Sequence, residues 1–203
     1  MIEKSDKAKD LYRQLFKGRE DVYATRWEKG GDSGYRPAYV VDWQAYNKHK
    51  AQGGTFKNFK GKEYEALSNA TYERHWSGEE FIGIYPLLPD NTSNFIAADF
   101  DKDNWRDHIL SFSKTCSEYE LDHLLEKSRS GNGGHLWIFF NAAYPAYKSR
   151  AIVFELLRKA NVISEFSKDG SFDRLFPNQD SHTGLGLGNL IALPLHGTLM
   201  AEG

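Results

Sequence analysis

The sequence predicts an α+β fold in which helices pack against a mixed or antiparallel sheet. From about residue 94, strand-like and helix-like segments follow one another in the order β-α-β-β-α-β. The chain has 203 residues, of which 40% are hydrophobic and 27% charged. A chain of this size and composition can bury a core as one domain, or as one domain with a small satellite.

The region before residue 90 is predicted to be mainly helical and irregular. Residues 3–16 carry apolar side chains at helical spacing, and residues 62–76 are expected to form a second helix. Between them, residues 32–59 are rich in Gly, Lys and Asn, which indicates irregular structure with one short helix at 43–50. A strand is predicted at 81–87.

Residues 91–203 are expected to hold a split βαβ core of the ferredoxin-like or RNA-recognition-motif-like type. Residues 1–90 are expected to form an N-terminal α/β subdomain packed on this core as one continuous unit. The expected strands of the C-terminal part are 95–101, 122–127, 136–140, 162–166 and 189–193, and its expected helices are 104–119 and 146–160.

Charge and cysteine content exclude several classes of protein. The formal net charge is −2, so no global positive field is available for nucleic acid, and any phosphate-binding surface must be local. Cys116 is the sole cysteine, which excludes a disulfide framework and a cysteine-based zinc site. No apolar run approaches the roughly 18 residues of a membrane span, and the charged N-terminus lacks a signal-peptide pattern. We therefore expect a cytoplasmic protein without a membrane partner.

The first chemical candidate is the pair Asp99 and Asp101. Alternation along a strand puts both carboxylates on one face, with Cα atoms about 6.5–7 Å apart. Two like charges at this spacing repel unless a cation neutralises them, and shared divalent cations are one solution. The alternative is that Asp101 caps the following helix and Asp99 is merely exposed.

The second candidate is the glycine-rich turn at residues 128–135. Its glycines allow backbone N–H groups to approach a phosphate, and Arg129, Ser130, Asn132 and His135 add side-chain donors. The alternative is an ordinary hairpin turn. No phosphate-binding P-loop and no dinucleotide fingerprint occurs in the sequence, so ATPase and dinucleotide functions lose their usual support.

The third candidate is Asp173, a carboxylate flanked by apolar residues. A metal shared with Asp99 and Asp101 would give it a partner, and an ion pair with Arg174 is the alternative. In the expected fold, all three candidates can converge on one face of the sheet.

These three motifs resemble, in order and type, those of the archaeo-eukaryotic primase superfamily. Longer strings extend the resemblance over nearly the whole chain, and they are similar to the primase-polymerase domains of TOTE conflict systems and CRISPR-associated primase-polymerases. The matching strings are GREDVY at 18–23, GIYPLLP at 83–89, AADFD at 97–101, SRSGNGGH at 128–135, FDRLFPNQ at 172–179 and GNLIALP at 188–194.

The resemblance implies an RNA-recognition-motif-like catalytic fold that carries out template-directed nucleotidyl transfer in DNA replication or repair. It implies two Mg²⁺ or Mn²⁺ ions held by Asp99, Asp101 and Asp173. It also implies that the incoming triphosphate and its surroundings contact Ser130, His135, Arg129, Asn132, Gly133, Gly134 and Asn189. The implied partners are a DNA or RNA template and primer, nucleoside triphosphates, and other domains or CRISPR adaptation proteins. Related domains often carry a cysteine-rich zinc insert, but residues 32–69 contain no cysteine, so no zinc is expected.

Before residue 65, lysines alternate with aromatic residues, a pattern for which a solvated flexible loop is the expected structure. The alternative is a local basic surface, because such lysines can neutralise phosphates while aromatic rings stack on the bases of a single strand. By contrast, Trp27, Trp43 and Trp76 are expected to fill small core clusters. The basic and aromatic residues in question are Lys48, Lys50, Lys57, Lys60 and Lys62 with His49, Phe56, Phe59 and Tyr64.

Two other functions compete with the primase-polymerase hypothesis. One is a non-catalytic module that binds single-stranded nucleic acid through aromatic side chains of its central strands. The other is a metal-dependent nuclease or cyclase that uses the same carboxylates. The sequence leaves open whether ribonucleotides or deoxynucleotides are preferred and whether synthesis starts without a primer.

Overall fold

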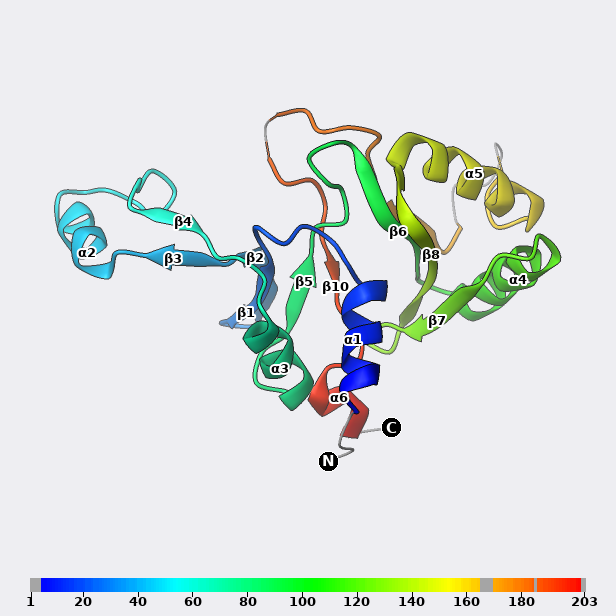
Figure 1. Cartoon of the computed structure of the whole chain (residues 1–203), viewed down its shortest axis with the longest axis horizontal. Helices are drawn as coiled ribbons and strands as arrows, with labels where there is room; N and C mark the ends of the chain where they lie inside the picture. The colour runs from blue at the N-terminus through cyan, green and yellow to red at the C-terminus, as the bar shows by residue number, and fades with distance from the viewer. Residues whose placement is uncertain (1–4, 165–169, 185, 202–203) are drawn as a thin grey trace.

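The computed structural model describes residues 5–164, 170–184 and 186–201, and within them the chain forms three sheets and six helices (Figure 1). We call one of the two four-stranded sheets the central sheet, and every neighbouring pair of its strands is antiparallel, which confirms the predicted α+β class. This central sheet has the strand order β7-β8-β6-β9, formed by His123–Lys127, Gly133–Pro145, Thr92–Asp101 and Phe172–Phe176.

The central sheet follows the predicted β-α-β-β-α-β order. The chain runs through β6, α4 (Trp105–Glu118), β7, β8, α5 (Ala146–Lys159) and β9. The strand predicted at 162–166 is wrong over Val162–Ser164, and its last two residues lie outside the described residues. Val162 instead ends the turn after α5, because its N–H donates to the Leu157 carbonyl and its side chain is buried. The fourth strand is β9.

The two faces of the central sheet have different neighbours. Helices α4 and α5 cover one face, and they pack on alternate side chains of β6 (Figure 1). The contacts of this core include Ile96, Ala98 and Phe100 of β6, Phe112 of α4 and Leu157 of α5. Asp99 and Asp101 therefore lie on the opposite face, the one that also carries Trp137 of β8.

Helix α1 (Asp6–Leu15) joins this second face to the N-terminal part. The Ser5 hydroxyl caps the helix by accepting the Ala8 N–H. The Phe16 ring packs edge-on against Trp137, with centroids 5.0 Å apart, and Tyr12 donates to the Pro194 carbonyl. The predicted helix is confirmed over its described part.

A second four-stranded sheet lies beside α1. Its order is β10-β5-β1-β2, formed by Ile191–Ala192, Ile82–Ile84, Ala24–Lys29 and Asp32–Pro37. The predicted strands at 81–87 and 189–193 are therefore shorter than expected, and they pair with each other. The β10–β5 pairing links the N-terminal and C-terminal parts, and the division between 1–90 and 91–203 stays a prediction.

Two expectations for the N-terminal part are wrong. The segment from residue 32, expected to be irregular, forms β2 and pairs with β1 through a turn in which Gly30 and Gly31 have positive φ. The hydrophobic pattern of the sequence does not predict this hairpin, because many residues of β1 and β2 are polar and exposed. The helix expected at 62–76 begins only at α3 (Asn69–Ser77), where Ser68 caps it.

The segment between β2 and α3 forms an extension that we call the arm (residues 39–64). It consists of β3 (Tyr39–Val41), α2 (Trp43–Ala51) and β4 (Lys62–Tyr64), and it projects from the second sheet away from the central sheet (Figure 1). Helix α2 confirms the short helix predicted at 43–50. Trp76 is buried as expected, but Trp27 is 36% exposed and Trp43 is 62% exposed, so the core expectation is wrong for Trp27 and Trp43.

The last described element is α6 (Gly197–Ala201). Among the described residues, no helix has the length and apolar character needed to span a bilayer.

Candidate functional site

Three carboxylates converge where β6 and β9 lie side by side. Asp99 and Asp101 occupy the C-terminal end of β6, and Asp173 occupies β9. One ligand oxygen from each lies within 4.8 Å of the others. The strand pairing produces this cluster, since Asp99 lies opposite Arg174 in the β6–β9 register. The structure therefore brings together the three acidic residues singled out in the sequence.

The surroundings of Asp101 disfavour its ionisation. Partial burial raises the pKa of Asp101, and the negative charges of Asp99 and Asp173 raise it further. His135 and Arg174 act in the opposite direction. Carboxylates arranged in this way bind a cation favourably, because the cation removes their mutual repulsion.

Arg174 is one of the two positively charged groups that oppose the rise in the pKa of Asp101. Its Nε atom lies 2.5 Å from Asp173 Oδ2, so the ion pair considered as an alternative from the sequence is present together with the cluster. The Arg174 side chain is 50% exposed and that of Asp173 is 34% exposed, so solvent screens the pair.

His135 lies directly opposite Asp99 in the pairing of β6 with β8. Its Nε2 atom is 3.4 Å from Asp99 Oδ1, and its Nδ1 atom is 2.9 Å from Glu126 Oε2. Burial alone would lower the pKa of His135, but hydrogen bonds and charge interactions with the two carboxylates raise it to about 10. The structure therefore favours an imidazolium at this position.

Glu126 is a site residue that the sequence reasoning missed. The same Oε2 atom accepts hydrogen bonds from His135 and from the indole N–H of Trp137, the latter at 2.8 Å. Glu126 lies on β7 opposite His135. The sequence does show an acidic residue near the end of the strand that precedes the turn. Predicting its contact with His135 would have required the register between β7 and β8.

The glycine-rich turn is the connection between β7 and β8. The Ser128 N–H donates to the Gly133 carbonyl, and Gly131 has a φ of +77°. At Gly133, a β-carbon would overlap Asp101 Oδ1 and would lie 2.5 Å from the Phe100 carbonyl oxygen. At Gly134, it would lie 2.7 Å from the Trp105 ring. These two positions need glycine because other groups pack against them.

This geometry agrees with the comparison between the chain and known families. Residues 7–203 match the family described as the TOTE conflict system, archaeo-eukaryotic primase domain. The chain belongs to this primase family. A comparison with curated proteins finds no match.

Ser128, Arg129 and Ser130 of the primase domain's turn line a cleft. Ser130 Oγ is 3.1 Å from Ser128 Oγ and accepts the Asn132 N–H at 3.3 Å, and the Arg129 guanidinium lies 5.8 Å from the centre of the Phe81 ring. The cleft has a volume of about 800 Å³, and its lining includes Arg129, Ser130 and His135 from the site and apolar residues of α1 and α6.

Asn189 of the primase domain has a different setting. Its side-chain oxygen accepts the Asn178 N–H at 3.1 Å, and its amide nitrogen donates to the Leu175 carbonyl at 3.2 Å. These bonds attach the segment before β10 to the end of β9. Asn189 therefore supports the strand that carries Asp173, and a direct contact between Asn189 and a nucleotide stays a prediction.

Proposed function

We propose that the chain is a primase-polymerase catalytic domain that joins nucleoside triphosphates to a 3′-hydroxyl under the direction of a template. The observation that carries this proposal is the convergence of Asp99, Asp101 and Asp173 within 4.8 Å, with His135 Nε2 at 3.4 Å from Asp99 Oδ1. Family membership agrees with nucleotidyl transfer as the reaction class.

The acidic residues fit a pair of divalent cations. Their ligand atoms are carboxylate oxygens, which Mg²⁺ and Mn²⁺ prefer. The raised pKa of Asp101 reflects burial first and then repulsion by Asp99 and Asp173, and a cation would remove that repulsion. Bound there, such ions would promote ionisation of the 3′-hydroxyl and neutralise negative charge on the phosphates. Asp99 and Asp101 would hold both ions, and Asp173 would complete the site nearest the primer.

His135 would bind the incoming triphosphate. Glu126 fixes the ring through Nδ1, which leaves Nε2 on the side of the acidic cluster. An imidazolium donates strong, charge-assisted hydrogen bonds to phosphate oxygens. Glu126 is thus a positioning residue in this proposal, because it acts through His135.

The glycine-rich turn would bind the rest of the triphosphate. Gly133 and Gly134 let the backbone approach Asp101 and Glu126 closely. Arg129 and Ser130 line the cleft, and Asn132 is bonded to Ser130 through its N–H, so the three would supply neutral and charged donors.

The central sheet is proposed to be an RNA-recognition-motif-like catalytic core. Three features support this: the β-α-β-β-α-β order, the antiparallel strand order β7-β8-β6-β9, and the placement of both helices on one face. The proposed site lies on the other face. Template, primer and nucleotides are the proposed partners, while further domains and CRISPR adaptation proteins stay predictions.

Product analysis tests the function. A labelled primer on a template should lengthen in the presence of Mg²⁺ or Mn²⁺ and nucleotides. Shortening of the primer would indicate a nuclease. Formation of a cyclic nucleotide in the absence of template would indicate a cyclase. The binding-module alternative is less favourable, because Asp99 and Asp101 lie on the sheet face where such a module would contact its nucleic acid, and they would repel the phosphate chain.

A further inference from the structure

The arm has an electrostatic character opposite to that of the chain as a whole. Residues 39–64 contain five lysines and two acidic residues, a formal charge of +3 in a chain whose net charge is −2. Elsewhere, many cations are paired with acids, as in Arg19 with Asp21 and Arg150 with Asp180. The exposed lysines of the arm are Lys48, Lys50, Lys57 and Lys60. None of these four lysines forms an ion pair within 4 Å with any residue that the structure describes.

The arm is held together by its own aromatic core. The Tyr46 ring packs edge-on against Phe56 at 5.5 Å and against Phe59 at 5.4 Å, and His49 packs against Phe59. His49 also lies 2.9 Å from Asn58 Oδ1, which accepts the Thr55 N–H. The loop that follows α2 is therefore ordered by specific contacts.

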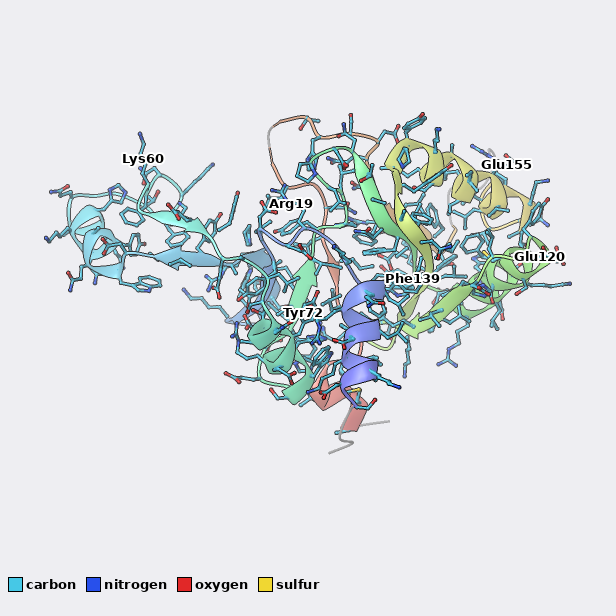
Figure 2. The ribbon with its side chains drawn as sticks, viewed as in Figure 1. Arg19, Lys60, Tyr72, Glu120, Phe139 and Glu155 are labelled. Atoms are coloured by element: carbon cyan, nitrogen blue, oxygen red, sulfur yellow. The ribbon has the colours of Figure 1, made fainter. Side chains whose placement is uncertain are left out.

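Lys62 belongs to this framework, which corrects the alternative in which it is one of the phosphate-binding lysines. Its ammonium group donates to the carbonyls of Phe56, Lys57 and Phe59, and it lies 4.7 Å from the centre of the Phe56 ring. Lys62 thus fixes the loop from which Lys57 and Lys60 project. Figure 2 shows Lys60 on the arm with its side chain directed outward.

Two aromatic side chains of the arm stay accessible. Trp43, at the start of α2, is 62% exposed, and Tyr64, in β4, is 45% exposed. Trp43 packs edge-on against Tyr46, with ring centroids 5.9 Å apart, and Tyr64 stacks on Tyr39 at 5.2 Å, so both rings are positioned by the arm while part of each stays exposed. Large exposed rings next to unpaired lysines match the requirements of a single-stranded polynucleotide, whose phosphates need cations and whose bases need stacking partners.

We infer that the arm binds a single-stranded polynucleotide, with Lys48, Lys50, Lys57 and Lys60 neutralising its phosphates and Trp43 stacking on a base. The inference rests on the proposed function, since the bound strand would be the template. It assigns the strand-binding charge to an extension that lies apart from the acidic cluster. The part of the template held there would lie away from the three carboxylates and would not be repelled by them.

The test is the binding of fluorescent oligo(dT) and oligo(U) to the full chain, measured by anisotropy in EDTA over a range of salt concentrations. The arm variant changes Lys48, Lys50, Lys57 and Lys60 to Gln. The matched control changes four exposed lysines of α1, α4 and α5, namely Lys7, Lys114, Lys148 and Lys159, to Gln and so removes the same charge. Thermal unfolding confirms that both variants fold.

The arm variant should lose about tenfold or more in affinity at low salt. The slope of log K against log salt should fall by about 3, because each phosphate contact on a single strand contributes about 0.7. Trp43→Ala should weaken binding about tenfold, and Trp43→Phe should restore most of the loss. The control variant should bind like wild type, and a response to either oligonucleotide supports the inference.

The same affinity and salt slope in wild type, arm variant and control would overturn the inference, as would equal losses in the two variants. Because the assay contains EDTA and no nucleotide, it is independent of catalysis. Failure of primer extension with intact strand binding would reject the proposed function and leave the arm's role standing. Normal primer extension by wild type, together with unaltered strand binding in the arm variant, would support the proposed function and reject the role of the arm.

Discussion

Gly133 of β8 lies directly against the carboxylate of Asp101. A β-carbon at position 133 would overlap Asp101 Oδ1 and would approach Ser128 Oγ to 3.3 Å. The backbone of the glycine-rich turn therefore sets the position of one of the three clustered carboxylates. In this primase domain, the turn and the acidic cluster are therefore in direct contact.

Gly133→Ala should reduce nucleotide incorporation by at least about tenfold, because the added methyl group displaces Asp101 or moves the turn. The stability cost should be about 1–3 kcal/mol, as for other overpacking substitutions. Single-nucleotide incorporation and denaturant unfolding measure the two effects. Gly186→Ala is the matched control, since a β-carbon there meets no atom within 4 Å. Equal activity in the two variants would contradict the close packing.

Divalent cations should stabilise the wild-type chain. Mn²⁺ or Mg²⁺ would remove the repulsion among the three carboxylates, so the Tm should rise with cation concentration by mass action. The rise should be a few degrees in wild type and should largely vanish in Asp99→Asn/Asp101→Asn. Scanning fluorimetry with a Ca²⁺-free, EDTA-treated sample measures it. A similar rise in the double variant would place the cation elsewhere.

In EDTA, the raised pKa of Asp101 predicts a specific pH dependence. Folding favours the protonated carboxyl, so its stabilisation is present below the ordinary value of 3.8 and is lost as pH rises through the raised pKa. Asp101→Asn should therefore be more stable than wild type at neutral pH. The advantage should shrink as pH falls toward 3.8, and a constant difference at all pH values would contradict the repulsion.

The site illustrates what the sequence could and could not predict. Alternation along a strand is a local property, so it placed Asp99 and Asp101 on one face correctly. The contribution of Asp173 was predicted from motif order and chemistry, and pairing between β6 and β9 provides the contact. Glu126 was missed, because its role depends on the alignment of β7 with β8.

The fold shows the same limit. The β-α-β-β-α-β order was predicted from local patterns, but the β1–β2 hairpin was not, because polar side chains carry no alternating signal there. Lys62 reads as a surface cation in the sequence. In the structure, its ammonium group donates hydrogen bonds to three backbone carbonyls of the preceding loop. These carbonyls converge only when the loop is folded, so the sequence pattern does not predict the contacts.

Glu126→Gln should weaken the placement of His135. It removes one of the two carboxylates that raise the pKa of His135 to about 10, so that pKa should fall. Loss of the charged hydrogen bonds should cost about 1.5–3 kcal/mol. If Glu126 acts through His135, KM for the nucleotide should rise several-fold, with a smaller change in kcat. NMR titration and steady-state kinetics measure these effects, and an unchanged pKa would contradict the coupling.

The raised pKa of His135 predicts that the stability of the folded chain in EDTA falls at high pH. Its folded-state pKa is raised from 6.5 to about 10, so the stabilisation is complete below 6.5 and is lost as pH rises through about 10. Wild type should lose stability over this window relative to His135→Gln. Parallel unfolding curves for the two proteins across that window would contradict the imidazolium assignment.

Arg174→Gln should strengthen cation binding. The guanidinium pairs with Asp173 and lies close enough to interact electrostatically with Asp99 and Asp101, so it competes with a metal for the same carboxylates. We expect Mn²⁺ affinity to rise a few-fold, measured by calorimetric titration without nucleotide. Arg36→Gln is the control, since Arg36 is an exposed residue of β2, outside the central sheet. Weaker Mn²⁺ binding in Arg174→Gln would show that Arg174 supports the metal site.

The most direct test of the central claim is single-nucleotide incorporation into a labelled primer on a template with Mg²⁺ or Mn²⁺. It should compare wild type with Asp99→Asn, Asp101→Asn and Asp173→Asn, and with Asp103→Asn, an exposed acid from the same segment, as the control. Wild type and the control should extend the primer, and each cluster variant should lose about 100-fold or more. Extension at wild-type rates by the cluster variants would contradict the account, as would a wild-type chain that binds the template but extends no primer with either ion.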